Sequence, residues 1–339
     1  MNSQYVVMEY SVSVIIPVFK VERFIERCCR YLFEQTLEST EFIFVDDCSP
    51  DNSVSIINKV QEEYPGRKDD VKIVRHVVNR GLPSARNSGL KVASGEYIFH
   101  CDSDDWLEKN ALSFLYEEAT KKNADAIWCD WYLSFKGNER YMSQKPEQER
   151  IFSGLESVQL MLGGRIRYNV WNKLVKRKLY TTNEIQFPDG YGMGEDMTMI
   201  KLFAFANRVI YLPTALYHYV RLNEDAFTQN ITEQHLQQIQ YNVNDIVIFL
   251  NKRYKKENIE KYIHFFKLNT KLPFLISNDI ESYKRWLEWY PEANAYIALN
   301  PMFSTRTKFI QKVAIKRHFW ILKLYYNLVI RFIYGVIYK

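Results

Sequence analysis

The sequence lacks the glycine-rich loops that mark two large classes of nucleotide-binding proteins. It contains 12 glycines in 339 residues, and the turn after its first apolar segment, Pro17-Val18-Phe19-Lys20-Val21, contains none. A dinucleotide fold needs glycines in that turn so that the backbone can approach the pyrophosphate. A phosphate-binding P-loop needs Gly-Lys followed by Ser or Thr, and the chain has no such segment. Hydride transfer and P-loop hydrolysis are therefore both disfavoured.

The Cys-x-x-Cys spacing, the pattern of a signal peptide and long apolar runs are also missing. The five cysteines show no Cys-x-x-Cys spacing, which argues against a zinc site and is typical of a reduced cytoplasm. The N-terminus lacks the basic start and apolar stretch of a signal peptide. No run reaches the roughly 18 uncharged apolar residues of a membrane-spanning helix. With 47% hydrophobic residues, we expect a cytoplasmic protein with one large domain or two unequal ones.

Acidic residues are absent after Glu292. Eight basic residues follow it, so this segment carries +8 while the preceding residues carry −3, which together give the net charge of +5. Placed on one helix, residues 312–338 align Lys312, Lys316 and Lys323 in a basic stripe beside a wide aromatic face, the pattern of an interfacial helix. We therefore predict docking on a membrane surface, with a buried terminal helix or a homodimer seam as alternatives. No nucleic acid partner is expected, because the cations that would contact phosphates lie beside so apolar a surface.

Three carboxylates follow the apolar run at residues 97–99: Asp102, Asp104 and Asp105. Burying them unpaired would cost several kcal/mol, so we expect them to face a crevice and a partner. Hard oxygen ligands suit Mg²⁺ or Mn²⁺, with phosphate oxygens completing the shell. The alternative is a helix N-cap, because residues from Leu107 onward have a helical pattern.

Short apolar runs alternate with helical patterns through the first 130 residues. Strands are predicted at 13–19, 42–45, 71–74, 97–99 and 126–129, with helices at 22–33, 53–64, 83–92 and 107–120. This alternation favours right-handed crossovers and a parallel sheet, whose ligands bind beyond the carboxyl ends of the strands. From about residue 232 the chain is predicted to be helical. We place a domain boundary between 1–228 and 229–339.

Six motifs in order resemble one family: Ser13–Phe19, Val45–Asp51, Ser84–Gly89, Gly95–Ile98 running into Asp102–Asp105, Trp171–Lys173 and Gly194–Asp196. Over residues 11–220 they resemble the inverting family 2 glycosyltransferases of bacterial polysaccharide synthesis, which have a GT-A fold. The resemblance implies an α/β nucleotide-sugar-binding domain with a mostly parallel central sheet, followed by an α-helical C-terminal extension.

The resemblance also implies a donor site. Pro17 and Phe19 would border the base and ribose of a nucleotide sugar, which we expect to be UDP-linked. Asp47, or Asp46 as the alternative, would accept a hydrogen bond from uracil. Arg86 would lie near the base and diphosphate, whereas an ordinary helical arginine would pair with a surface acid.

The Asp-x-Asp element would hold the cofactor. Asp104 is the expected ligand of Mn²⁺ or Mg²⁺, and Asp102, with Ser103 beside it, would contact ribose or metal-bound water. His218 is a further metal candidate by analogy with relatives that use a late histidine, and packing is its alternative role.

The same resemblance assigns the chemistry. Asp196, with Glu195 beside it, would be the catalytic base that removes the proton of the attacking hydroxyl. Trp171 and Asp105 would shape the acceptor side. Two of these residues have simpler alternatives: Asp196 as the cap of a helix starting at Met197, and Trp171 as a core aromatic.

Together these observations predict a metal-dependent inverting transferase. It would move a hexosyl or N-acetylhexosaminyl group to a glycan or lipid-linked saccharide in surface polysaccharide synthesis, as a peripheral protein at the inner face of the membrane. The rival hypothesis is a non-catalytic glycan- or membrane-binding scaffold on a decayed transferase fold. The intact Asp102, Asp104 and Asp196 argue against that rival.

Overall fold

The structure is a computed structural model that describes residues 10–135, 138–221, 232–329 and 331. The chain divides into two compact units. The first comprises Met1–Ser157 with Tyr168–Ile246, and the second comprises Val158–Arg167 with Val247–Lys339. The boundary predicted at 228 lies outside the described residues.

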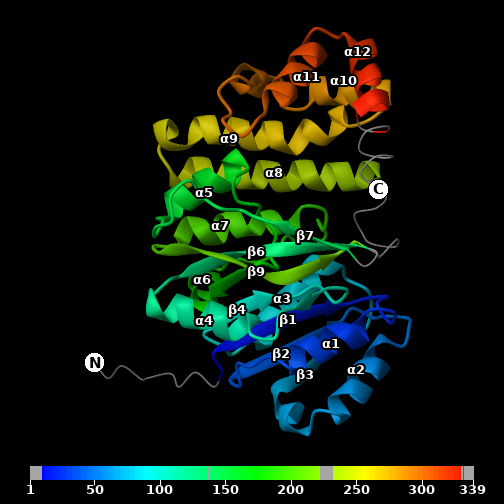
Figure 1. Cartoon of the computed structure of the whole chain (residues 1–339), viewed down its shortest axis with the longest axis vertical. Coiled ribbons are helices and arrows are strands. Elements are labelled where there is room, and N and C mark those ends of the chain that lie inside the picture. Colours follow the sequence, from blue (N-terminus) through cyan, green and yellow to red (C-terminus); the bar gives the residue numbers. More distant parts are fainter. Residues whose placement is uncertain (1–9, 136–137, 222–231, 330, 332–339) are drawn as a thin grey trace. The chain divides into compact units, whose positions relative to one another are not determined.

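Among the described residues, nine strands form one sheet in the order β3-β2-β1-β4-β8-β6-β9-β5, and β7 pairs with β6 (Figure 1). The strands are β1 Val12–Val18, β2 Thr40–Asp46, β3 Val71–Arg75, β4 Tyr97–His100, β5 Trp106–Leu107, β6 Ala126–Phe135, β7 Asn138–Met142, β8 Lys173–Lys176 and β9 Val209–Val220. The helices of this unit are α1 Ile25–Phe33, α2 Ser53–Glu62, α3 Leu82–Val92, α4 Ala111–Lys121, α6 Arg177–Thr182 and α7 Thr198–Phe205.

The first four strands in space, β3-β2-β1-β4, are all parallel. β1 and β2 are buried almost throughout, as expected of parallel strands covered by crossover helices on both faces. Helix α3 packs on β1 and β2. The predicted α/β class is confirmed, and the parallel part of the sheet is the part that the alternating pattern predicted.

The rest of the sheet is mixed. β8 runs antiparallel to both β4 and β6, while β6 and β9 are parallel. Sequence analysis did not predict β8, because two of its four residues are lysines, yet all four are buried. The helix predicted from Leu107 begins instead at Ala111, because Trp106 and Leu107 pair with β9 as β5. Residues 138–142, for which no strand was predicted, form β7.

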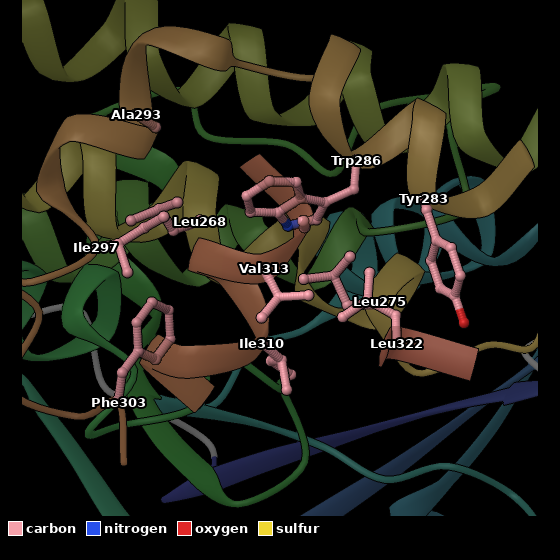
Figure 2. Close-up of a cluster of buried hydrophobic side chains, with 11 residues drawn as sticks. Leu268, Leu275, Tyr283, Trp286, Ala293, Ile297, Phe303, Ile310, Val313 and Leu322 are labelled. Atoms are coloured by element: carbon pink, nitrogen blue, oxygen red, sulfur yellow. The ribbon is translucent and has the colours of Figure 1, made fainter. Parts of the chain in front are cut away.

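The second unit is helical and has its own core. Helix α5, Gly154–Gly163, and helix α8, Glu233–Arg253, each belong partly to both units; α9 Lys256–Lys271, α10 Ile280–Glu288, α11 Thr305–Ile315 and α12 Phe319–Tyr325 complete the second. Figure 2 shows side chains from α9 to α12 converging in one buried cluster, which contains Leu268, Leu275, Tyr283, Trp286, Ala293, Ile297, Phe303, Ile310, Val313, Ala314 and Leu322. The predicted helical C-terminal region is confirmed.

The prediction of a single helix over residues 312–338 is wrong within the described residues. α11 ends at Ile315, and Arg317 adopts a left-handed φ of 57°. The amide of His318 donates to the carbonyl of Val313 at 3.2 Å, which closes the turn before α12 begins. The basic stripe is therefore divided between two helices.

None of the helices in the described residues is both long enough and apolar enough to cross a membrane.

Candidate active site

The carboxyl ends of β2, β1 and β4 lie next to one another at one edge of the sheet. Val18 is the register partner of Asp46 on β2, and β1 pairs with β4 on its other side. The loops that leave β1 and β2 are joined by a hydrogen bond from the backbone amide of Lys20 to Ser49 Oγ at 2.8 Å. Phe19 is 40% exposed at this edge. The tertiary structure thus brings together the segments predicted to hold a nucleotide.

The two aspartates at the end of β2 have different environments. The buried carboxylate of Asp47 accepts hydrogen bonds from the backbone amides of Arg80 and Gly81, both at 2.8 Å, and lies 2.6 Å from Nδ1 of His76. These contacts fix the loop that leads into α3. Asp46 is half-buried and accepts from the amide of Ser49 at 2.8 Å. Asp46 is therefore more exposed than Asp47, and which of the two contacts a base stays a prediction.

Arg86 on α3 joins two of the predicted site segments. Its Nη2 donates to Asp102 Oδ1 at 2.9 Å and its Nε donates to Glu195 Oε1 at 3.2 Å. The arginine is buried, so its charge depends on these two carboxylates. Its Nη1 is buried as well and has no hydrogen-bond partner among the described residues. An unsatisfied cationic donor beside Asp102 is suited to a phosphate oxygen.

Glu195 and Asp196 lie on a 3₁₀ turn that precedes α7. Gly194 enters the turn with a left-handed φ of 88°, which glycine adopts without strain. Neither carboxylate caps α7, whose N-cap residue is Met197. Burial and then the neighbouring charge of Glu195 raise the pKa of Asp196 to about 8. A carboxyl with so high a pKa is a good proton acceptor once ionised.

The three acids after β4 have separate environments. Asp105 is fully buried, and it accepts from the hydroxyl of Tyr217 and the backbone amide of Val220, both at 2.7 Å. It thereby ties the turn to β9, and this geometry gives no support to the acceptor role predicted for it. Asp102 and Asp104 are half-buried, while Ser103 between them is buried.

Sequence reasoning missed Tyr217. Its hydroxyl also accepts from the backbone amide of Asp102 at 3.1 Å, so one side chain of β9 holds both ends of the acidic turn. Alternation along the strand separates it from His218, which points to the other face. That alternation can be read from the sequence, but which of the two residues faces the site cannot.

His218 and Trp171 lie in aromatic packing. The ring of His218 stacks on Trp106 at a centroid distance of 3.3 Å, and its nitrogens lie 2.9 Å from Glu108 and 2.7 Å from Glu139. Both nitrogens are thus engaged, and metal binding would require one contact to break. Trp171 is 7% exposed and stacks on Tyr217 and Tyr219. Its role at the acceptor side stays a prediction.

The Asp-x-Asp element fits a divalent cation of the expected kind. Within the part of the chain that the structure describes, no group of three or more His, Cys, Asp or Glu side chains is placed to enclose a metal ion. Mg²⁺ does not need such a cage, because it is commonly held by one or two carboxylates together with substrate phosphates and water. The half-buried Asp102 and Asp104 supply oxygens of that type.

Comparison with known sequences assigns the family. The family model "Glycosyl transferase family 2" matches residues 13–190, slightly more than half of the chain. The chain belongs to glycosyltransferase family 2. This transferase is 30% identical over 275 residues to the uncharacterized glycosyltransferase EpsJ of Bacillus subtilis (strain 168), with 79% of this chain and 77% of EpsJ covered. The poly(ribitol-phosphate) beta-N-acetylglucosaminyltransferase TarS of Staphylococcus aureus is 29% identical over 218 residues, which cover 62% of this chain and 36% of TarS.

Solved structures confirm the GT-A fold of this transferase. S. aureus TarS 1–349 in complex with UDP-GlcNAc matches with a TM-score of 0.71 at 18% identity, covering 94% of this chain and 91% of that one. The mannosyltransferase PcManGT from Pyrobaculum calidifontis, in complex with GDP-Man and Mn²⁺, matches with a TM-score of 0.53 at 15% identity, covering 94% and 83%.

Proposed function

We propose that this transferase moves a hexosyl or N-acetylhexosaminyl group from a UDP-sugar to a glycan acceptor with inversion at the anomeric carbon. One observation carries the proposal. Arg86 is hydrogen-bonded to both Asp102 and Glu195, so the Asp-x-Asp element and the segment of the predicted base lie beside one buried cation. This shared contact supports the proposal that the carboxylates assigned to donor binding and to proton acceptance act on one substrate.

The reaction is a single displacement. The oxygen of the acceptor hydroxyl forms a bond to sugar C1 while the bond from C1 to the diphosphate oxygen breaks, and UDP leaves with that electron pair. The proton of the hydroxyl passes to the carboxylate of Asp196. The raised pKa of Asp196, caused by burial and by Glu195, favours acceptance of that proton. One displacement inverts the configuration, so an α-linked donor gives a β-linked product.

The donor would lie across the ends of β1, β2 and β4. Asp46 would accept from the uracil ring, since the carboxylate of Asp47 already accepts from Arg80 and Gly81. The unsatisfied Nη1 of Arg86 would donate to a phosphate oxygen. Support for a UDP-sugar comes from TarS, which shares the fold and was solved with UDP-GlcNAc.

Asp104 and Asp102 would hold Mn²⁺ or Mg²⁺. The bound ion would stabilise negative charge on the departing diphosphate as a Lewis acid. PcManGT, which has the same fold, was solved with Mn²⁺.

The acceptor is proposed to be a growing surface polysaccharide or a lipid-linked saccharide, met at the cytoplasmic face of the membrane. TarS is named for transfer to poly(ribitol-phosphate), a polymeric acceptor. The acid-free C-terminal segment would bring the enzyme to such a membrane-bound acceptor.

The test is release of UDP by the full chain from a panel of UDP-sugars with Mn²⁺ or Mg²⁺. We expect slow release that EDTA abolishes, that added Mn²⁺ restores, and that Asp104→Ala eliminates. Asp69→Ala, which removes an exposed acid near β3, is the matched control and should retain release. No release from any UDP-sugar, with or without an acceptor glycan, would reject the proposal and favour a non-catalytic scaffold.

A further inference from the structure

Helices α11 and α12 bury one set of apolar side chains and expose another. Ile310, Val313 and Leu322 point into the core of the second unit, as Figure 2 shows. Phe309, Ile315, Trp320, Leu324 and Leu328 are between 44% and 69% exposed. We call these five residues the terminal surface. Because the core is already filled from the other side, the terminal surface does not contribute to it.

The exposed residues of α12 and the turn after it follow a helical stripe. Trp320, Leu324 and Leu328 are spaced by four, so they lie one above another. Trp320 is the most exposed at 69%. Leu322, two positions along, lies on the opposite side and is 1% exposed. Helix α12 therefore has apolar side chains on two opposite sides, and only one of these sides is covered by the core.

Most of the charges around the terminal surface are positive. Lys312, Lys316 and Arg317 are exposed at the end of α11 and in the turn, and no acid occurs after Glu292. Lys323 on α12 is half-buried, and its charge contributes to lowering the pKa of Asp279, after the backbone hydrogen bonds from Glu281 and Ser282. Asp279 is thus an acid near the edge of the surface.

We propose that the terminal surface docks on an anionic lipid bilayer. Indole and aliphatic side chains would enter the interfacial layer while the flanking lysines and arginines meet lipid phosphates. The exposed apolar stripe of Trp320, Leu324 and Leu328 follows the basic end of α11, and an apolar stripe beside basic residues is typical of a helix that binds at an interface. The excess of positive charge from Lys312, Lys316 and Arg317 favours this occupant, because anionic lipid headgroups complement it.

A second copy of this chain is a poorer occupant. A twofold dimer would place the same patch against itself, so Lys312, Lys316 and Arg317 of one copy would approach the same cations of the other. Like charges opposed across an interface are unfavourable. The proposal extends the proposed function by naming the surface that meets a lipid-linked acceptor, but lipid binding is measurable without sugar transfer.

The experiment is co-sedimentation of the full chain with phosphatidylcholine vesicles, with and without phosphatidylglycerol. We expect binding to the anionic vesicles that added salt weakens, and much weaker binding to phosphatidylcholine alone. Trp320→Ser with Leu324→Ser should reduce binding at least about tenfold, since two large apolar side chains leave the interface. Lys312→Glu with Lys316→Glu should remove the preference for anionic lipid.

Leu299→Ser is the matched control. Leu299 is 64% exposed in the same unit but lies outside the terminal surface, so its loss should leave vesicle binding unchanged. Absence of binding, equal binding to both vesicle types, or no effect of the Trp320 and Leu324 changes would overturn the proposal. A dimer that those two changes dissociate, measured by analytical ultracentrifugation, would also overturn it.

Release of UDP is measured on the same variants. Vesicle binding without UDP release would support the docking surface and reject the proposed function. UDP release without vesicle binding would support the proposed function and reject the docking surface.

Discussion

Arg86 Nη2 lies 2.9 Å from Asp102 Oδ1 in the first of the two units. The arginine side chain is 2% exposed and that of Asp102 is 29% exposed. A buried guanidinium is stable only while its carboxylate partners are present. The pair therefore links the stability of the protein to the proposed donor site, and the first prediction follows from it.

Arg86→Ala should destabilise the protein by about 3–5 kcal/mol, because it leaves Glu195 buried without its cation. Thermal unfolding measures this loss. Arg150→Ala breaks the exposed ion pair with Glu156 and should change the free energy of unfolding much less than Arg86→Ala does, because exposed ion pairs contribute little to stability. Similar small losses for both variants would show that Arg86 does not compensate buried charge.

The rate should depend on the ionisation of Asp196. Below its pKa of about 8 the carboxyl is protonated and cannot accept a proton, so kcat/KM should rise with pH until that value is passed. Asp196→Asn should lower kcat by about 10²–10⁴-fold and remove the rising limb. Initial rates of sugar transfer across pH measure both effects.

Asp69→Asn, a change at an exposed acid, is the control and should retain the wild-type profile. A flat profile in the wild-type enzyme would contradict the assignment of Asp196 as the base.

The two aspartates at the end of β2 should respond differently to substitution. Asp47→Asn should reduce stability by about 1–3 kcal/mol, because its oxygens satisfy the amides of Arg80 and Gly81. Asp46→Asn should leave stability almost unchanged and weaken UDP binding. Calorimetric titration with UDP and thermal unfolding separate the effects. Unchanged UDP affinity in Asp46→Asn would remove that residue from the donor site.

Asn242 on α8 should act as a positioning residue. It is buried, and its Nδ2 donates to the carbonyls of Tyr191 and Met193 at 3.0 and 2.9 Å. These bonds hold the loop that enters the turn of Glu195 and Asp196. A displacement of 1 Å at a reacting group can cost about 10²-fold in rate, so Asn242→Ala should lower kcat at least about tenfold with a smaller change in donor KM.

Asn269→Ala provides the comparison for Asn242. Its Nδ2 donates to the carbonyl of Leu162 in the C-terminal unit at 3.1 Å, so its loss should affect stability but not kcat. Equal effects of the two variants on kcat would indicate a general loss of stability rather than displacement of the base.

Much of the fold was predictable because local patterns agree with it. Buried parallel strands need continuous apolar segments, and β1, β2 and β4 have them. β8 escaped prediction, since Lys173 and Lys176 are stable in a buried strand only because polar partners compensate their burial. Lys173 donates to the carbonyl of Asn169 at 2.6 Å, and Lys176 lies 3.3 Å from Asp125.

The amino-acid sequence by itself determined the α/β order of the first unit, the segments that follow its parallel strands and the acid-free basic C-terminus. Only the tertiary structure decided that Asp105 turns inward to Tyr217 and that Arg86 joins Asp102 to Glu195. It also decided that the chain turns at Arg317. The physical reason is that spacing along the chain assigns a residue to an element, whereas the burial and charge of neighbours from distant segments decide what its side chain can bind.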